Sequence, residues 1–471
     1  MKKYFLIDYI KYITFVIIIF LDTNAFGVQT DLSTNDNLSN NVKEIKIING
    51  KQKQTFLGFG ASQPTDQNRL FMQYGTARVM ALAKVVYGDL GMNWARLWVH
   101  SNEKYSVMEM KQKFYQSYAD NSYIKILRSS GAKNLLLAPA RGELPPGESM
   151  QEYARKIAKF IFEINSERGI KINTTGIANE PAGFSAEQLH DAVKFLRIEL
   201  DALGMHDVGI IGPECASPDA CASRSIIAIK SDAISWNGLR GVATHSYNMG
   251  ANALVENLIG GTGKEYWISE AGRMLPRLVD EEPGEVDEAS TTAARFLNDM
   301  NHSVTHWFWF IGVGHFDKHP AKDSGQVLAR PDDITGGIKL NTKYHYLKQL
   351  RSAFDLGAVF YEANSNREKR MNWGYGQKPA ITASTAQNPD GSWAIGVVNT
   401  TGISTTKIAQ YFPASSYRVS IKLPAGASNA VFRSYRSKPD GFLETEIVKV
   451  EKTGVVNLLV VPNELVTLRS K

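Results

Sequence analysis

Two glutamates that each end a short apolar run are the residues of this sequence best suited to chemistry. Glu180 closes a β-branched run within residues 172–184, and Glu270 closes a second strand-like run at 266–269. In α/β barrels, side chains at the carboxyl ends of the strands carry out the reaction. Two carboxyl groups placed in this way predict cleavage of a glycosidic bond, in which one group donates a proton and the other attacks the sugar.

The two glutamates are expected to differ in role. Cleavage that retains the configuration of the sugar needs one protonated and one ionised carboxyl group. We predict that Glu180 is the acid/base, that Asn179 beside it binds the 2-hydroxyl of the sugar, and that Pro181 fixes the turn. Glu270 is predicted to be the nucleophile, oriented by a neighbouring phenol or cation. A solvated surface charge is the alternative for any single glutamate, but it suits two strand-ending glutamates poorly.

Strand and helix patterns alternate along the part of the chain that holds both glutamates. Strands are expected at 57–62, 94–99, 134–139, the run before Asn179, 208–212, 241–247, 265–270 and 304–310. A helix is expected at 150–164, another begins at Ser185 with Gln188 completing a capping box, and a last one covers 344–354. Eight such steps predict an α/β fold, a (β/α)8 TIM barrel over residues 57–356.

The character of the sequence changes after Gly357. Short strand-like runs occur at 380–384, 393–398, 417–423 and 455–461, and Asn388–Gly391 is a strong hairpin signal between the first two. We therefore predict an accessory antiparallel β-sandwich over 357–471. Residues 28–56 are expected to be a polar lead-in followed by the first strands of that sandwich.

The first 27 residues have the pattern of a secretory signal peptide. Lys2 and Lys3 precede an apolar run at 12–21, and the small residues Ala25 and Gly27 follow it. An uncleaved membrane anchor is the alternative, but this run is shorter than the roughly 20 residues that span a bilayer. We expect an exported protein, secreted or periplasmic, without stable membrane insertion.

Overall composition is that of a soluble globular protein. Hydrophobic residues make up 43% of the 471 residues and charged residues 21%, with a formal net charge of +6. Because the basic excess is mild and has no Lys/Arg run, nucleic acid is not expected as a partner. We expect a monomer whose partner is a polysaccharide or glycoconjugate substrate.

Neither the cysteines nor the histidines predict a metal site, and no cofactor is expected. Cys215 and Cys221 form either a small disulfide loop or two free thiols, and the sequence leaves both open. A further group consists of His302, His306, His315, His319 and Asp317. These residues are close in sequence, but they do not have the spacing of a short zinc motif.

Several short motifs occur in a fixed order over nearly the whole chain. They are Gly58-Phe59-Gly60, Arg96, Asn179-Glu180-Pro181, His245-Ser246-Tyr247, Ser269-Glu270, the stretch 301–309, and in the accessory part 388–391 and 396–399. Together they resemble glycoside hydrolase family 30. This family of retaining (β/α)8 enzymes includes glucosylceramidases, glucuronoxylanases and β-1,6-glycanases.

The resemblance implies a role for each site residue. The two glutamates keep the roles given above, and Arg96 and Tyr247 are implied to flank the nucleophile and keep it ionised. The residues implied to contact sugar are Asn179, His245 and Trp309, the last as the floor of the reacting subsite. For Arg96, His245 and Trp309 the respective alternatives are a structural ion pair, a core histidine and a packed core indole.

One motif departs from the family pattern. The third strand leads into 138–143, which has no tryptophan and instead contains Arg141, so a differently built subsite is expected. The sequence thus predicts an exported retaining β-glycoside hydrolase that is similar to β-1,6-galactanases and glucanases or to xylanases. It would act by double displacement through a covalent glycosyl-enzyme intermediate. A non-catalytic carbohydrate-binding barrel and a transglycosylase are the alternatives.

Overall fold

The computed structural model describes residues 42–63, 67–101, 105–140, 147–247, 249–272, 285–314, 326–367, 378–402 and 412–470. The predicted signal peptide, most of the lead-in, Arg141, and the group His315, Asp317 and His319 lie outside these residues. Within the described ranges, none of the helices combines the length and apolar character needed to cross a membrane.

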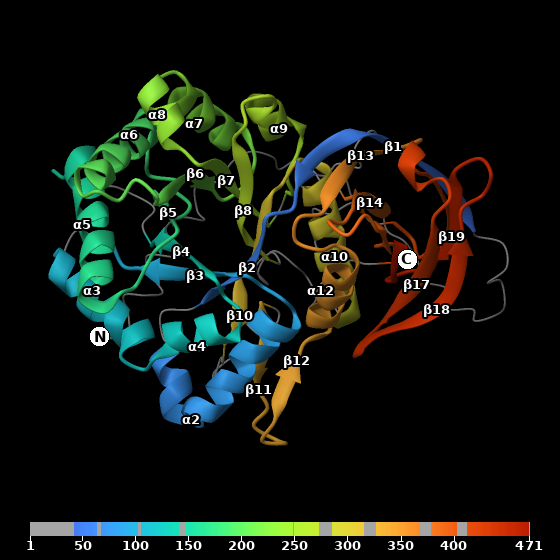
Figure 1. The fold of residues 1–471 in the computed structure, drawn as a ribbon, viewed down its shortest axis with the longest axis horizontal. Coiled ribbons are helices and arrows are strands. Elements are labelled where there is room, and N and C mark those ends of the chain that lie inside the picture. Colours follow the sequence, from blue (N-terminus) through green and yellow to red (C-terminus); the bar gives the residue numbers. More distant parts are fainter. Residues whose placement is uncertain are drawn as a thin grey trace, which may run out of the picture. The chain divides into compact units, whose positions relative to one another are not determined.

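A closed barrel of eight parallel strands forms the larger part of the fold (Figure 1). Its strands, in order around the barrel, are β2 (Gly58–Gln63), β3 (Trp94–Val99), β4 (Asn134–Pro139), β5 (Thr174–Gly176), β6 (Gly209–Cys215), β7 (Gly241–Ser246), β8 (Glu265–Ala271) and β9 (His306–Trp309). Each strand neighbours the next one in the sequence, and β9 closes the ring on β2. The predicted (β/α)8 barrel is confirmed.

Helices surround this barrel and connect its strands. They are α2 (Gln67–Ala83), α3 (Val107–Phe114), α4 (Tyr123–Ser130), α5 (Met150–Arg168), α6 (Ala186–Ala202), α7 (Ala220–Lys230), α8 (Ala233–Gly238), α9 (Ala253–Ile259), α10 (Glu285–Asn301) and α12 (Thr342–Ala353). The capping box predicted for α6 is present, because the Ser185 side chain accepts from the Gln188 backbone and the Gln188 side chain accepts from Ser185 N–H.

Apolar side chains fill the amino-terminal half of the barrel interior. Six buried residues pack there as one cluster, namely Trp94, Leu136, Ile211, Ala243, Trp267 and Phe308. The His306 ring stacks on Trp267 with 3.7 Å between ring centroids, and its burial holds the pKa of His306 well below the usual value. This packed cluster, with a neutral histidine in it, closes the barrel beneath the strand ends that carry the glutamates.

The accessory domain is one hydrogen-bonded sheet of nine strands. They are β1 (Lys43–Thr55), β13 (Val359–Ser365), β14 (Ile381–Gln387), β15 (Trp393–Asn399), β16 (Tyr417–Lys422), β17 (Val431–Lys438), β18 (Gly441–Lys449), β19 (Val455–Val460) and β20 (Leu465–Ser470). Their order across the sheet is β18-β17-β20-β15-β14-β13-β1-β16-β19. All pairs of neighbouring strands are antiparallel except β1 with β16. The predicted antiparallel arrangement therefore holds for every pair but that one.

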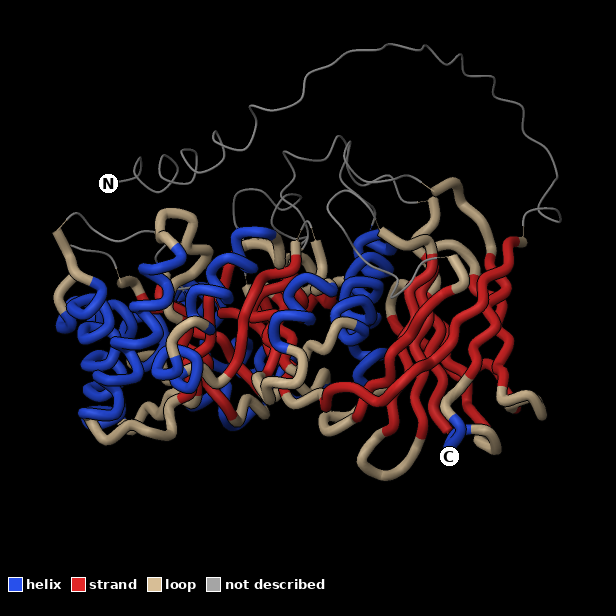
Figure 2. The backbone as a smooth tube through the Cα atoms, turned by 90° about the horizontal axis from the view of Figure 1, so that it is seen from above, coloured by secondary structure: helices blue, strands red, loops and turns tan. Residues whose placement is uncertain are grey.

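Helices α10 and α12 lie between the barrel and this sheet (Figure 1 and Figure 2), and buried hydrogen bonds join them to the sheet. The Asn301 side chain on α10 donates to the Ala383 carbonyl at 2.8 Å, and the Ser384 hydroxyl donates to the Leu297 carbonyl at 2.8 Å. From α12, the Gln349 amide donates to the Leu465 carbonyl at 3.1 Å. A smaller sheet of β10 (Ile311–Val313), β11 (Val327–Pro331) and β12 (Ile338–Leu340) follows the last barrel strand.

Candidate active site

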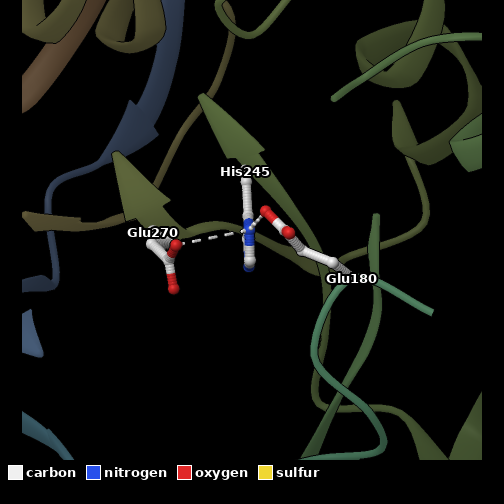
Figure 3. Close-up of side chains that lie close together, drawn as sticks. All are labelled: Glu180, His245 and Glu270. Carbon is white, nitrogen blue, oxygen red and sulfur yellow. Dashed lines mark hydrogen bonds and ion pairs between the residues drawn. The ribbon is translucent and has the colours of Figure 1, made fainter. Parts of the chain in front are cut away.

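The two predicted glutamates meet at the carboxyl ends of the barrel strands, with His245 between them (Figure 3). One oxygen of Glu180, one ring nitrogen of His245 and one oxygen of Glu270 all lie within 4.8 Å of one another. His245 Nδ1 is 2.9 Å from Glu180 Oε1 and 3.8 Å from Glu270 Oε1. Residues separated by ninety positions (270 − 180) are therefore close enough to act on one bond.

Glu270 is buried and held through both oxygens. Arg96 Nη1 donates to Oε2 at 2.5 Å, and the Tyr247 hydroxyl donates to Oε1. Burial alone would lower the pKa of Arg96, but the charges of Glu270 and Glu214 hold that pKa above its usual value. The guanidinium therefore stays charged, and Glu270 has a cation at one oxygen and a phenol at the other.

Glu180 and His245 form a second ion pair. Burial raises the pKa of Glu180, but the hydrogen bond and charge of His245, together with Arg96, hold it below the usual value. Burial lowers the pKa of His245. The charge of Glu270 and, next in size, the hydrogen bond with Glu180 outweigh burial, so the pKa of His245 is raised above its usual value. The two shifts have opposite directions, so each residue favours the charged form of the other.

Asn179 lies beside Glu180 and is oriented by Arg96. Arg96 Nη2 donates to Asn179 Oδ1 at 2.8 Å. This hydrogen bond fixes the orientation of the amide, whose nitrogen is a hydrogen-bond donor. The predicted residues Arg96, Asn179, Glu180 and Glu270 are therefore joined in one network.

Local irregularities in three strand pairs aim these side chains into the barrel mouth. Register shifts occur between Pro213 and Cys215 in β6 and between Thr244 and His245 in β7. The pairing of β8 with β9 is also shifted, between Ile268 and Ala271. Such bulges interrupt strict alternation and re-aim a side chain. Each shift falls at or beside a charged residue of the site.

The structure does not bring Trp309 to this cluster. On β9 the residues that face into the barrel alternate, so His306 and Phe308 point inward and Trp309 points outward into the layer under the helices. Its side chain is 1% exposed, and its indole N–H donates to the Gln326 carbonyl at 2.6 Å. The alternative given above, a packed core indole, describes this placement.

Two other aromatic side chains, Phe310 and Trp98, lie beside residues of the charged network. Phe310, half-buried at the end of β9, lies edge-on to Tyr247 with 6.3 Å between ring centroids. Trp98, half-buried on β3, lies under the Arg96 guanidinium at 4.5 Å. The sequence signal for both residues is the alternation of inward and outward side chains along a strand. Phe310 is two positions after Phe308 and four after His306. Trp98 is two positions after Arg96 and four after Trp94.

Glu214 is a site residue that the sequence analysis missed. It lies near the end of β6, its side chain has no exposed surface, and Arg96 Nη2 approaches its Oε1 at 3.4 Å. Its backbone carbonyl accepts from the Glu180 N–H at 3.2 Å. The strand had been predicted to end at Gly212, before Pro213, and it continues through the bulge to Cys215.

Cys215, Cys221 and His302, whose side chains are of types that can bind a metal, are separate from this network. Cys215 and Cys221 are free thiols with 3.9 Å between their sulfur atoms. His302 Nδ1 contacts the Asn298 carbonyl at 2.8 Å. Within the described ranges, the group whose atoms converge as metal ligands would is Glu180, His245 and Glu270. Because Arg96 and Tyr247 already occupy both oxygens of Glu270, we interpret this group as a proton-transfer site.

Comparisons with known proteins find similarity in structure. No family model matches the sequence, and no curated protein sequence matches it. The catalytic domain of GH30 xylanase C from Talaromyces cellulolyticus is similar, with a TM-score of 0.66 and 14% identity over 90% of this chain and 100% of that chain. An endo-β-1,6-glucanase has a TM-score of 0.59 and 17% identity over 90% of this chain and 93% of its own.

The similarity extends to a second family. A GH51 arabinofuranosidase from Xanthomonas axonopodis pv. citri has a TM-score of 0.59 and 13% identity, covering 91% of this chain and 100% of that chain. The chain thus has a GH30-like fold, a (β/α)8 barrel with an accessory β domain. At these identities the likeness defines the fold, and the chemistry has to be argued from the site.

Proposed function

We propose that this protein is a retaining glycoside hydrolase of the family 30 type, with Glu180 as acid/base and Glu270 as nucleophile. The observation that carries the proposal is the approach of the two carboxyl groups, whose nearest oxygens lie within 4.8 Å. Retaining enzymes separate these groups by about 5–5.5 Å, whereas inverting enzymes leave about 6.5–9.5 Å for a water molecule. The short distance supports direct attack by a carboxylate.

In the first half-reaction, Glu270 attacks the anomeric carbon while Glu180 protonates the departing oxygen. The proton comes from the Glu180–His245 pair, whose hydrogen bond joins Nδ1 to Oε1 at 2.9 Å. Arg96 and Tyr247 hold Glu270 in one orientation before the attack. A glycosyl ester on Glu270 and a free leaving group result.

In the second half-reaction, Glu180 accepts a proton from water, which attacks the same carbon and releases Glu270. Ester formation has by then removed the negative charge of Glu270, and that charge is the largest attraction raising the pKa of His245. The Glu180–His245 pair consequently loses its proton more readily in the intermediate. This change suits the switch of Glu180 from acid to base.

The substrate class we propose is a β-linked polysaccharide or glycoconjugate. Phe310 and Trp98 provide aromatic faces beside the charged network, and such faces pack against sugar rings. The similar structures include a xylanase and an endo-β-1,6-glucanase, so xylan and β-1,6-linked glucan are the first candidates. We further propose that the protein is exported, on the pattern of residues 1–27.

The first prediction tests this function with a polysaccharide panel. Purified protein is incubated with β-1,6-glucan, β-1,6-galactan, glucuronoxylan and a glucosylceramide, and released reducing sugar is measured. We expect cleavage of one substrate and a loss of about 10³-fold or more in kcat for Glu270→Gln, since the amide cannot form the intermediate. NMR of the first product should show the β-anomer.

The matched control is Glu256→Gln, which removes a carboxylate that binds Lys53 and Ser303 away from the site. It should cleave the same substrate at close to the wild-type rate. Full activity of Glu270→Gln, or an α-anomer as the first product, would contradict the proposed mechanism. Sugar binding without cleavage would favour a carbohydrate-binding barrel.

A further inference from the structure

Glu214 is the carboxyl group of the site that the proposed mechanism does not use. Its side chain has no exposed surface, and its Oε1 has a long contact of 3.4 Å with Arg96 Nη2. Its Oε2 is buried and has no hydrogen-bond partner in the described part of the chain. An ionised carboxylate is costly to bury with so few donors, whereas a neutral carboxylic acid is not.

The charges around Glu214 do not balance unless one carboxyl group is neutral. Facing it are Arg96 from β3, His245 from β7 and Glu270 from β8, and Glu180 is bonded to its backbone. Three carboxyl groups therefore share two cations. Arg96 binds Glu270 at 2.5 Å and His245 binds Glu180 at 2.9 Å, which leaves Glu214 with the longest of the three contacts.

The fold makes specific room for this side chain. A Cβ atom on Gly176 would lie 1.7 Å from Glu214 Oε2, so a larger residue at that position of β5 would displace the carboxyl group. Glu214 itself has φ 58°, in the left-handed region that strains a non-glycine residue. Strained backbone of this kind concentrates at functional sites, and here it directs a buried carboxyl group at Arg96.

The direction of its titration agrees with the geometry. Burial raises the pKa of Glu214 above the ordinary 4.5, against the charges of Arg96 and His245 and the nearby Ser269 hydroxyl, and the charge of Glu270 adds to the increase. The neutral form is thus favoured in the folded protein.

We propose that Glu214 is a positioning residue for catalysis: as a neutral acid it holds Arg96 Nη2 and leaves the arginine charge to Glu270. When it ionises at higher pH, it competes with Glu270 for Arg96, and the site loses activity. This inference rests on the proposed function, because it assigns Glu214 a role through Arg96 and the nucleophile. It makes Glu214 part of what sets the upper pH limit of the enzyme.

The second prediction is the pH profile of Glu214→Gln, measured as kcat and KM on the substrate found above. The amide has the shape of the neutral acid and cannot ionise, so the basic limb should move up by about one pH unit. At the optimum, kcat should fall by about two- to fivefold with KM nearly unchanged, because the amide is a less well matched partner for Arg96. A basic limb that coincides with that of the wild type overturns the proposal.

Glu214→Met provides the same test if the amide variant does not fold, since methionine is neutral, similar in length and tolerated in irregular cores. Its basic limb should also move upward. A loss of activity by either variant at all pH values, without a change in the shape of the profile, would show a purely structural role and overturn the proposal.

Unfolding measurements test the neutral state of Glu214 without any substrate. A raised folded pKa gives stability that is fully present below the unfolded pKa, near 4.5, and that is lost as pH rises toward the folded pKa. In urea titrations across this range, Glu214→Gln should lose less stability with rising pH than the wild type, and Glu256→Gln should not show this change. Parallel curves for wild type and Glu214→Gln overturn the proposal. Absence of cleavage by the wild type on every substrate would instead count against the proposed function.

Discussion

The two halves of the barrel interior are built from the same strands and have opposite character. On β3, Trp94 lies in the amino-terminal half and Arg96 in the carboxyl-terminal half; on β8, Trp267 and Glu270 are divided in the same way. The lower residues are apolar and pack against one another, with the Trp94 and Trp267 rings edge-to-face and 5.1 Å between their centroids. The upper residues are charged and joined by ion pairs. Two or three positions along a strand separate these environments.

The difference shows how the barrel accommodates buried charge and strained backbone at its carboxyl-terminal end. Charged groups and left-handed backbone occur together above, where Glu180 has φ 45° and Glu214 has φ 58°. Below, the apolar cluster around Trp267 is buried, and the charges beside it, Arg240 and Glu265, pair with each other. Large apolar side chains contribute stability that offsets the strain and buried charge above them. We therefore expect changes below to act on stability and changes above to act on catalysis.

The third prediction concerns the lower half. Trp267→Ala removes the ring that packs against Trp94 and His306, and should lower the free energy of unfolding by about 3–5 kcal/mol. Urea denaturation followed by circular dichroism measures this loss. Trp267→Phe keeps an aromatic ring and should lose much less. Wild-type stability of Trp267→Ala would contradict the division between the two halves.

The fourth prediction acts at the boundary between the halves. Gly176→Ala places a methyl group against Glu214 Oε2 and forces the carboxyl group to move, and such overpacking typically costs about 1–3 kcal/mol. Because Glu214 contacts Arg96, part of this cost should be seen in kcat, which we expect to fall by about tenfold. Gly441→Ala, at a position with open space around it, is the control. Unchanged kcat in Gly176→Ala would separate Glu214 from catalysis.

The fifth prediction compares two adjacent aromatic residues at the end of β9. Phe310→Ala should raise KM by about three- to tenfold, in line with about 0.5–1.5 kcal/mol for an aromatic contact, and should change stability little. Trp309→Phe should lower stability without raising KM, since Trp309 is buried outside the barrel interior. The reverse result would return the sugar-contacting role to Trp309.

The barrel could be predicted from the sequence because its strands are short apolar runs with clear ends. The predicted strands at 94–99, 134–139 and 241–247 agree with β3, β4 and β7 to within one residue. Glu270 could be recognised because it stands at the end of such a run, and Arg96 because its strand resembles the family motif. The accessory strands were marked by alternation and by the hairpin at Asn388–Gly391, but their joining into one sheet depends on pairings between distant segments.

Glu214 and Phe310 could not be found in the same way, for two different reasons. Glu214 follows Gly212 and Pro213, which predict the end of a strand, and only the bulge in the folded barrel turns its side chain inward. Phe310 lies in a run of four aromatic residues at 307–310, where residue type does not separate inward from outward positions. Strict alternation from His306 would have selected Phe310 over Trp309.

The sheet order of the accessory domain has a consequence for how the chain is made. Strand β1, at the start of the described chain, lies between β13 and β16, with Ile47 opposite Ser365 and Ile421, 318 and 374 positions later (365 − 47; 421 − 47). Strand β20, the last one described, lies between β17 and β15. During synthesis, β1 leaves the ribosome long before any partner exists, and the sheet cannot close until β20 has been translated.

The barrel strands, in contrast, pair with their neighbours in the sequence and can associate as they emerge. A nascent chain halted before β20 would therefore hold a nearly complete barrel and an open sheet with unpaired strands, a form prone to aggregation. Cellular quality control of this protein should depend on whether β20 has been translated.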